Sequence, residues 1–196
     1  MKKLLIASFN KGKMEDYKSF MKNLDLELLT LKDLGITEDF EEIYDSFEKN
    51  ARGKAEFYSK LSGLPTLADD SGVEIPFYDM APGVHTKRWD GLGKNDEHYL
   101  NFILEKIKAI PQEQRIGQLR AVLALTIDDK THMSEGVIKG KLTDQVYQES
   151  VTHGYPWDRV FIIPELNKYY EELTPEENYK YNHRRLGIED LLQFMR

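Results

Sequence analysis

Two adjacent carboxylates stand in the segment LADDSG, where Asp69 and Asp70 follow the apolar stretch 65–68. In an extended chain their side chains point to opposite faces, so both need not enter one site. Two nearby carboxylates are costly to ionise together unless a cation neutralises them, and Mg²⁺ binds through one or two carboxylates plus substrate phosphate oxygens. The pair therefore fits a metal-assisted phosphate site and, with equal weight, a solvated turn into Ser71 and Gly72.

A candidate anion site lies in the segment SFNKGK, which begins at Ser8. A strand predicted over 3–8 leads there into a helix predicted from Lys11 to about Leu24. Backbone N–H groups at a helix N-terminus point into the preceding turn, and Lys13 adds a full positive charge. The segment is not a P-loop, because it lacks the glycine and the Ser or Thr that this motif requires. An ordinary capped helix with solvated lysines explains the segment equally well.

A rival reading comes from the triplet Asp70-Ser71-Gly72, which matches the Asp-Ser/Thr-Gly of aspartic proteases. In those enzymes two such loops share one proton between their carboxylates. The chain has a single copy, so a protease would have to be a symmetric dimer. The strand–turn–helix segment at SFNKGK and the helix-rich remainder do not suit that all-β architecture.

An acidic loop and a basic segment could add contacts to a phosphate-containing ligand. Glu41 and Glu42 lie in the loop that precedes Phe47, and either could bind a metal or be solvated. His183 stands beside Arg184 and supplies donors for a base carbonyl or a phosphate, although taken singly the segment is a basic helix entry. The histidines show no HExxH spacing, so zinc is not predicted.

The segment HGYPWDRVF, residues 153–161, holds aromatic side chains beside Asp158. Aromatic faces on a loop can stack on a nucleobase. They are as often used for packing, so the segment alone leaves both roles open.

The elements that must position these residues follow from hydrophobic periodicity and turn signals. Alternating helical and strand patterns favour one domain of mixed α/β type over residues 1–196. Helices are predicted over 11–24, 46–61, 95–110, from 174 and over 186–195, and strands over 3–8, 26–31, 65–68, 116–127, 133–142 and 157–163. The strand over 65–68 is expected to end where LADDSG turns.

Composition narrows the classes of partner. The 27 Lys and Arg against 34 Asp and Glu give a formal net charge of −7, which argues against general nucleic-acid binding through phosphate contacts. The chain has no cysteine, which excludes disulfides, a thiolate nucleophile and Cys-type zinc sites and fits a reduced, intracellular compartment. No run approaches the ~18 apolar residues of a membrane span, so no membrane partner is expected.

Taken in order, the segments SFNKGK, FEKNARGKA, LADDSG, APGVHTKRW, EGVIKGK, GYPWDRVF and NHR resemble the inosine triphosphate pyrophosphatase family. The resemblance spans Ser8 to Arg184, and the order of several motifs makes it specific. It implies an elongated, two-lobed α/β fold around a long mixed β-sheet flanked by helices, usually a homodimer. It also implies a cytoplasmic enzyme that uses Mg²⁺ to hydrolyse ITP, dITP and XTP to the monophosphate and pyrophosphate.

The resemblance also assigns residues. Asp70 matches the general base and metal-site aspartate, and Glu41, by its spacing to Phe47, is preferred to Glu42 as the second metal ligand. The positions that match substrate-binding residues are Ser8, Asn10, Lys13, Lys54, Ser71, Arg88, Tyr155, Trp157, Asp158, Lys180, His183 and Arg184.

The chain departs from the family pattern mainly on the side of the base. Tyr155 and Pro156 replace a phenylalanine and a glycine of the base loop, and Arg159 replaces a proline. Asn178 stands where the family has a substrate-binding lysine, although Lys180 lies two residues on. The motifs therefore predict the reaction type better than the base preference. The alternatives are a nucleotide-binding protein with weak or lost catalysis and a pyrophosphatase for another modified nucleotide.

Overall fold

The computed structural model describes residues 2–93, 97–149 and 155–195 of the chain. Seven strands form one sheet with the order β2-β1-β3-β4-β5-β6-β7. The strands are β1 (Lys2–Ile6), β2 (Leu26–Thr30), β3 (Thr66–Glu74), β4 (Ile116–Ile127), β5 (Lys130–Leu142), β6 (Phe161–Ile163) and β7 (Lys168–Tyr169). The helices are α1 (Lys11–Phe20), α2 (Phe47–Ser62), α3 (Glu97–Lys108), α4 (Pro175–Tyr181) and α5 (His183–Leu191).

The sheet is mixed, which confirms the predicted α/β class. β1 pairs in parallel with both β2 and β3, whereas β6 pairs antiparallel with β5 and with β7. β4 and β5 are joined by a tight turn, in which Asp128 and Asp129 have φ of 49° and 58°. Positive φ at both central residues is what a two-residue hairpin turn needs to match the twist of its strands.

The chain divides into two compact units. The first unit consists of Met1–Ser71, Ala121–Gly136 and His183–Arg196, and the second of Gly72–Arg120 and Val137–Asn182. The single domain predicted over residues 1–196 stays a prediction. Within the described ranges, none of the helices combines the length and the apolar character that crossing a bilayer would require.

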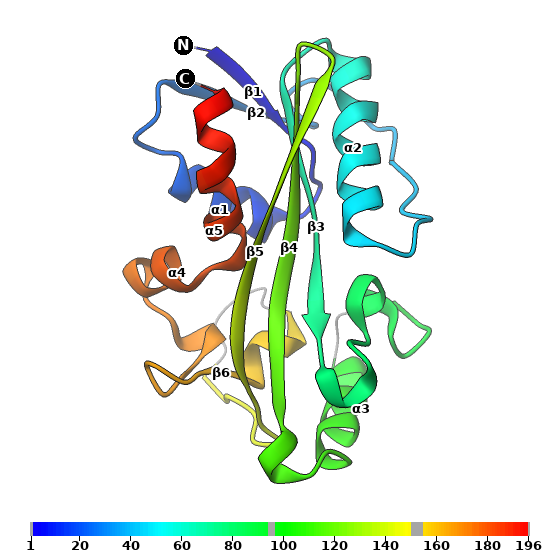
Figure 1. Cartoon of the computed structure of the whole chain (residues 1–196), viewed down its shortest axis with the longest axis vertical. Helices are drawn as coiled ribbons and strands as arrows, with labels where there is room; N and C mark the ends of the chain where they lie inside the picture. Colours follow the sequence, from blue (N-terminus) through cyan, green and yellow to red (C-terminus); the bar gives the residue numbers. More distant parts are fainter. Residues whose placement is uncertain (1, 94–96, 150–154, 196) are drawn as a thin grey trace. The chain divides into compact units, whose positions relative to one another are not determined.

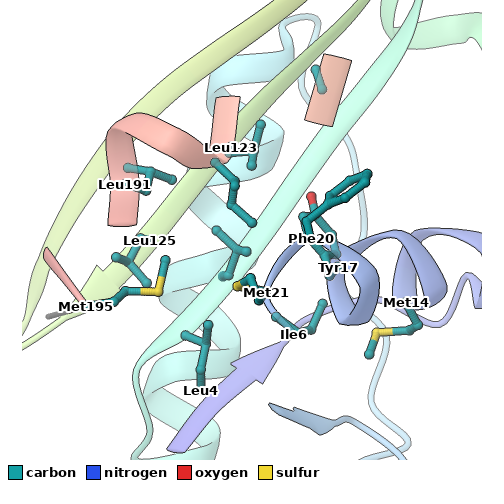
Figure 2. Packing of buried hydrophobic residues seen from close by; sticks show 13 residues of the cluster. Leu4, Ile6, Met14, Tyr17, Phe20, Met21, Leu123, Leu125, Leu191 and Met195 are labelled. Atoms are coloured by element: carbon teal, nitrogen blue, oxygen red, sulfur yellow. The ribbon is translucent and has the colours of Figure 1, made fainter. Parts of the chain in front are cut away.

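The core of the first unit lies between its strands and the helices α1 and α5. α1 and α5 are on one side of the strands and α2 is on the other (Figure 1). Figure 2 shows Leu4 and Ile6 of β1 meeting side chains from α1 and β4 in one buried cluster. The cluster contains Leu4, Ile6, Met14, Tyr17, Phe20, Met21, Leu67, Ala121, Leu123, Leu125, Ile188, Leu191 and Met195. The apolar face of α1 is buried in this cluster, which fixes the helix, and with it the turn at SFNKGK, against β1 and β3.

Capping residues stand at the ends of helices α1, α2 and α4. Asn10 caps α1, because its Oδ1 accepts the N–H of Lys13 at 3.2 Å. Ser46 caps α2, and Gly63 ends it in the left-handed region with φ of 69°, a conformation that glycine adopts without strain. Thr174 caps α4, with proline at its first position.

Several predicted boundaries were wrong. α1 ends at Phe20 rather than near Leu24, and β5 begins at Lys130 rather than at residue 133. β3 does not end at LADDSG but continues through it to Glu74, so both aspartates lie in a strand. Residues 156–159 form a 3₁₀ turn and the strand begins only at Phe161, because proline at the start of the turn presets a helical φ. The last helix begins at His183, three residues earlier than predicted. The predicted helix start at 95–96 lies outside the described residues.

Gly136 of β5 allows α5 to pack closely against the sheet. A Cβ atom there would lie 1.9 Å from the carbonyl oxygen of His183 and 2.7 Å from the backbone N of Gly187. We expect Gly136→Ala to lower the free energy of unfolding by about 2–3 kcal/mol, since two backbone segments must move apart. Urea denaturation measures this. Gly117→Ala is the control, because its Cβ would make only ordinary van der Waals contacts, with the Leu142 side chain at 3.4 Å and the Glu74 carbonyl oxygen at 3.5 Å. Equal losses in both variants would contradict the prediction.

Candidate active site

β3 places the two aspartates at the edge of the sheet where β1 also ends. Ile6 at the end of β1 pairs with Leu67 of β3, so parallel pairing brings the turn that follows β1 next to Asp69. Asp69 and Asp70 are 2% and 7% exposed. Successive strand residues face opposite sides, and the two carboxylates indeed have different partners. The solvated turn that the sequence also allowed is therefore not formed.

Asp69 is the centre of a buried cluster of cations. Its Oδ2 lies 2.8 Å from Lys13 Nζ and 3.3 Å from Arg184 Nε. Lys54 Nζ donates to the Asp69 main-chain carbonyl at 3.2 Å. Burial by itself raises the pKa of Asp69, but the charges of Lys13, Arg184 and Lys54 outweigh burial and hold this pKa well below its ordinary value. Asp69 therefore stays ionised and keeps basic groups close together.

Asp70 has the opposite electrostatic environment. Asn50 Nδ2 donates to Asp70 Oδ2 at 2.9 Å, and the backbone N–H of Ser71 donates to Oδ1 at 2.9 Å. Burial and the nearby charge of Glu42 nevertheless raise the pKa of Asp70 above its ordinary value, although Lys13 and Lys54 act against them. A carboxylate with a raised pKa is suited to accept a proton.

The structure brings Glu42, rather than Glu41, to the neighbourhood of Asp70. Glu41 is exposed, whereas Glu42 forms an ion pair with Lys54 and acts electrostatically on Asp70. Burial lowers the pKa of Lys54, but Glu42 and Asp69 more than compensate, so this pKa lies above its ordinary value and the ammonium is retained. The metal-binding role predicted for Glu41 stays a prediction.

The turn between β1 and α1 holds the residues that the sequence predicts for an anion site. Ser8 Oγ accepts the backbone N–H of Asn10 at 3.2 Å, and Asn10 in turn caps the helix. Both residues are half-buried. Lys13 lies in the first turn of α1, and its ammonium contacts the Asp69 carboxylate. The predicted residues of SFNKGK are thus brought together with those of LADDSG.

α5 begins with His183 and Arg184, which the structure also brings to this site. Arg184 Nη2 donates to Ser71 Oγ at 2.9 Å, and Nη1 lies 3.5 Å from Asp16 Oδ2. The guanidinium therefore joins α1, β3 and α5. His183 is 5% exposed, and burial followed by the charge of Arg184 lowers its pKa well below the ordinary value of 6.5.

The lowered pKa of His183 predicts a loss of stability in mild acid. The unfolded chain protonates this histidine below about pH 6.5, whereas the folded chain does not, so stability falls as the pH falls below that value. The expected slope is up to about 1.4 kcal/mol for each pH unit. Urea denaturation at pH 7, 6 and 5 should show a shallower pH dependence for His183→Gln than for the wild type. Parallel curves for the two proteins would contradict this assignment.

The other predicted substrate residues belong to the second unit. Arg88 and Lys180 are exposed, and Tyr155 and Asp158 are half-buried. Trp157 is 1% exposed, its ring stacks on Trp89 and its indole N–H donates to the Tyr99 hydroxyl at 3.3 Å. This favours a packing role for Trp157 over a contact with a base. Of the segment 153–161, residues 153–154 lie outside the described residues.

Sequence reasoning left two polar residues of the site without a role. Asp69 finds Arg184 across 115 positions of sequence, and no local pattern predicts such a contact. Asn50 did carry a signal, because it lies on the same face of α2 as the buried Phe47 and Ala51. A polar residue in the apolar stripe of a helix must find buried hydrogen-bond partners.

Comparisons with known proteins show the family to which this chain belongs. The model of the Ham1 family matches residues 4–194. The dITP/XTP pyrophosphatase of Bacillus subtilis is 32% identical over 196 residues, which cover 100% of this chain and 98% of the relative. The structure of the Staphylococcus aureus Ham1 protein has a TM-score of 0.83 at 31% identity and covers 99% of this chain and 98% of the other. A HAM1 protein from Coxiella burnetii has a TM-score of 0.86 at 27% identity, with coverage of 100% and 98%. A family match over nearly the whole chain, joined to an α/β fold that excludes the all-β aspartic proteases, shows that this chain belongs to the Ham1 family.

Proposed function

We propose that this protein hydrolyses dITP, ITP and XTP to the nucleoside monophosphate and pyrophosphate with Mg²⁺ as cofactor. The chain is a nucleoside triphosphate pyrophosphatase, a hydrolase of phosphoanhydride bonds: it belongs to the Ham1 family, and its full-length relatives are named dITP/XTP pyrophosphatases. One observation supports this proposal: Lys13, Lys54 and Arg184 contact Asp69, and the neighbouring residue Asp70 has a raised pKa.

The donor set near Asp70 fits a magnesium ion. Mg²⁺ is held by one or two carboxylates while phosphate oxygens and waters complete its shell. Asp70 and Glu42 supply two carboxylates. Burial, followed by the charge of Glu42, raises the pKa of Asp70, and a divalent cation would relieve the repulsion between the two carboxylates. In residues 2–93, 97–149 and 155–195 no group of three or more His, Cys, Asp or Glu could hold a metal by itself. A site completed by substrate oxygens is consistent with that finding.

Residues of the first unit have separate roles in the proposed hydrolysis. Water attacks the α-phosphorus, the bond to the bridging oxygen breaks, and pyrophosphate leaves. Asp70 accepts the proton of the water. Lys13, Arg184 and the backbone N–H groups of the first turn of α1 bind the phosphate charge. When bound, Mg²⁺ would neutralise part of the triphosphate charge and polarise the P–O bonds.

A substrate panel tests the proposal. Purified protein with Mg²⁺ should release pyrophosphate from ITP, dITP or XTP faster than from GTP or dUTP. Release only from another nucleotide would transfer the proposal to that substrate, since Tyr155, Pro156 and Arg159 alter the base loop. A nucleotide that raises the melting temperature but yields no pyrophosphate with Mg²⁺ or Mn²⁺ would instead support binding without catalysis.

The remaining parts of the proposal concern assembly and location. The resemblance to the inosine triphosphate pyrophosphatase family predicts a homodimer that acts on the cytoplasmic nucleotide pool and binds a small-molecule nucleotide rather than nucleic acid. Light scattering behind a size-exclusion column should therefore give about twice the 22.9 kDa of one chain. A mass of one chain at micromolar concentration would contradict the dimer.

A further inference from the structure

Asn50 is a polar residue on the buried face of α2. Its side chain is 1% exposed, and it shares this face with Phe47, Ala51 and Ala55. A buried amide without hydrogen bonds costs stability, so the residue must be fully partnered to be tolerated there. The proposed chemistry gives Asn50 no contact with substrate or metal.

The partners of Asn50 fix the orientation of its amide. Nδ2 donates to Asp70 Oδ2 at 2.9 Å and to the Tyr44 carbonyl at 3.1 Å, while Oδ1 accepts the Tyr44 N–H at 3.1 Å. Only the amide nitrogen can donate and only the oxygen can accept, so the flipped orientation would lose all three bonds. The amide thus binds the backbone of Tyr44 in both directions and has one N–H for Asp70.

These contacts constrain both carboxylates that we assign to the metal. Asn50 holds Oδ2 of Asp70 and the Ser71 N–H holds Oδ1, so the carboxylate is fixed from both sides. Tyr44 lies two residues after Glu42 in the loop that precedes α2. The same amide therefore ties the Glu42 loop to the strand that carries Asp70.

We propose that Asn50 is a positioning residue of the pyrophosphatase reaction. Its amide orients the Asp70 carboxylate and holds the loop that contains Glu42 in a fixed position relative to Asp70. The inference rests on the proposed function, because it assigns what Asn50 does for that reaction. Groups that orient metal-binding carboxylates from behind typically contribute about 10–100-fold to activity or metal affinity.

Asn50→Leu tests the inference, because leucine has a similar size but cannot donate or accept. We expect kcat to fall about 10–100-fold while KM changes less than about threefold. Tyr58→Phe is the matched control: the Tyr58 hydroxyl binds the same loop at Phe40 N–H and Glu38 carbonyl, at 3.1 and 2.8 Å, without touching Asp70. It should lower stability and leave kcat within about threefold of the wild type. An equal fall of kcat in both variants would show that loosening the loop suffices, and would overturn the inference.

A double-mutant cycle separates positioning from a general structural effect. If Asn50 acts through Asp70, then Asn50→Leu should change kcat less than about twofold in an Asp70→Asn background, since the group that it positions is gone. A fall of kcat as large in that background as in the wild type would overturn the inference.

A crystal structure of Asn50→Leu gives a readout that does not depend on activity. The Asp70 carboxylate should rotate away from its present position, and residues 41–45 should shift relative to β3. An unchanged Asp70 rotamer and loop would overturn the inference even if the enzyme were impaired. Failure of the wild type to release pyrophosphate would count against the proposed function alone, because the crystal structure still decides whether Asn50 holds Asp70.

Discussion

Asp70→Asn is expected to lower kcat for pyrophosphate release by about 10²–10⁴-fold, the usual contribution of a positioned general base. Asparagine has nearly the same shape, but only its amide oxygen can accept, so it keeps one of the two hydrogen bonds that Asn50 and the Ser71 N–H donate to Asp70. It cannot take a proton from water, and it is a poorer ligand for Mg²⁺. Steady-state kinetics with ITP and Mg²⁺ measure the effect.

The stability of Asp70→Asn is the control for this prediction. Burial and Glu42 raise the pKa of Asp70, which means that its charged form is disfavoured in the folded state. Loss of that charge should offset the one hydrogen bond that asparagine cannot accept, so the free energy of unfolding should stay within about 1 kcal/mol of the wild type. Activity that survives undiminished would remove Asp70 from the mechanism, and a large loss of stability would mean that the fall in kcat reports unfolding.

The sequence predicts the scaffold of the site well, because local signals set the elements. Asn10, Ser46, Gly63 and Thr174 cap or end the helices where expected. The prediction that β3 ends at LADDSG was wrong. Charged and small residues there look like a turn, but β3 continues to Glu74 because its aspartates find partners from other elements.

The contacts between residues far apart in the sequence are the part of the site that sequence motifs do not predict. The motif SFNKGK gave Lys13 and the motif NHR gave Arg184, yet nothing in either segment shows that both side chains meet on one oxygen of Asp69. Likewise, spacing to Phe47 favoured Glu41, whereas the ion pair with Lys54 places Glu42 at the site. A loop without periodicity gives no signal for which of two neighbouring side chains faces inward.

Asp69→Asn is expected to have a different effect from the same change at Asp70: a loss of about 3–5 kcal/mol in the free energy of unfolding, because removal of one member of a buried ion pair leaves the others uncompensated. The side chains of Lys13 and Arg184 are only 11% and 12% exposed, and that of Asp69 is 1% exposed. Urea denaturation of the two variants and the wild type at pH 7 measures the difference. Equal stability of Asp69→Asn and Asp70→Asn would contradict the role of Asp69 as the counter-charge of the site.

An anionic ligand should restore part of what Asp69→Asn loses. The substitution leaves Lys13, Lys54 and Arg184 with one negative charge fewer among them, and this is the environment that a phosphate group occupies best. A ligand that binds only the folded state stabilises it by RT ln(1 + [L]/Kd). Added pyrophosphate should therefore raise the melting temperature of Asp69→Asn more than that of the wild type. A smaller shift in the variant would mean that Asp69 holds the cations in a geometry that the ligand itself requires, so that its carboxylate serves binding as well as folding.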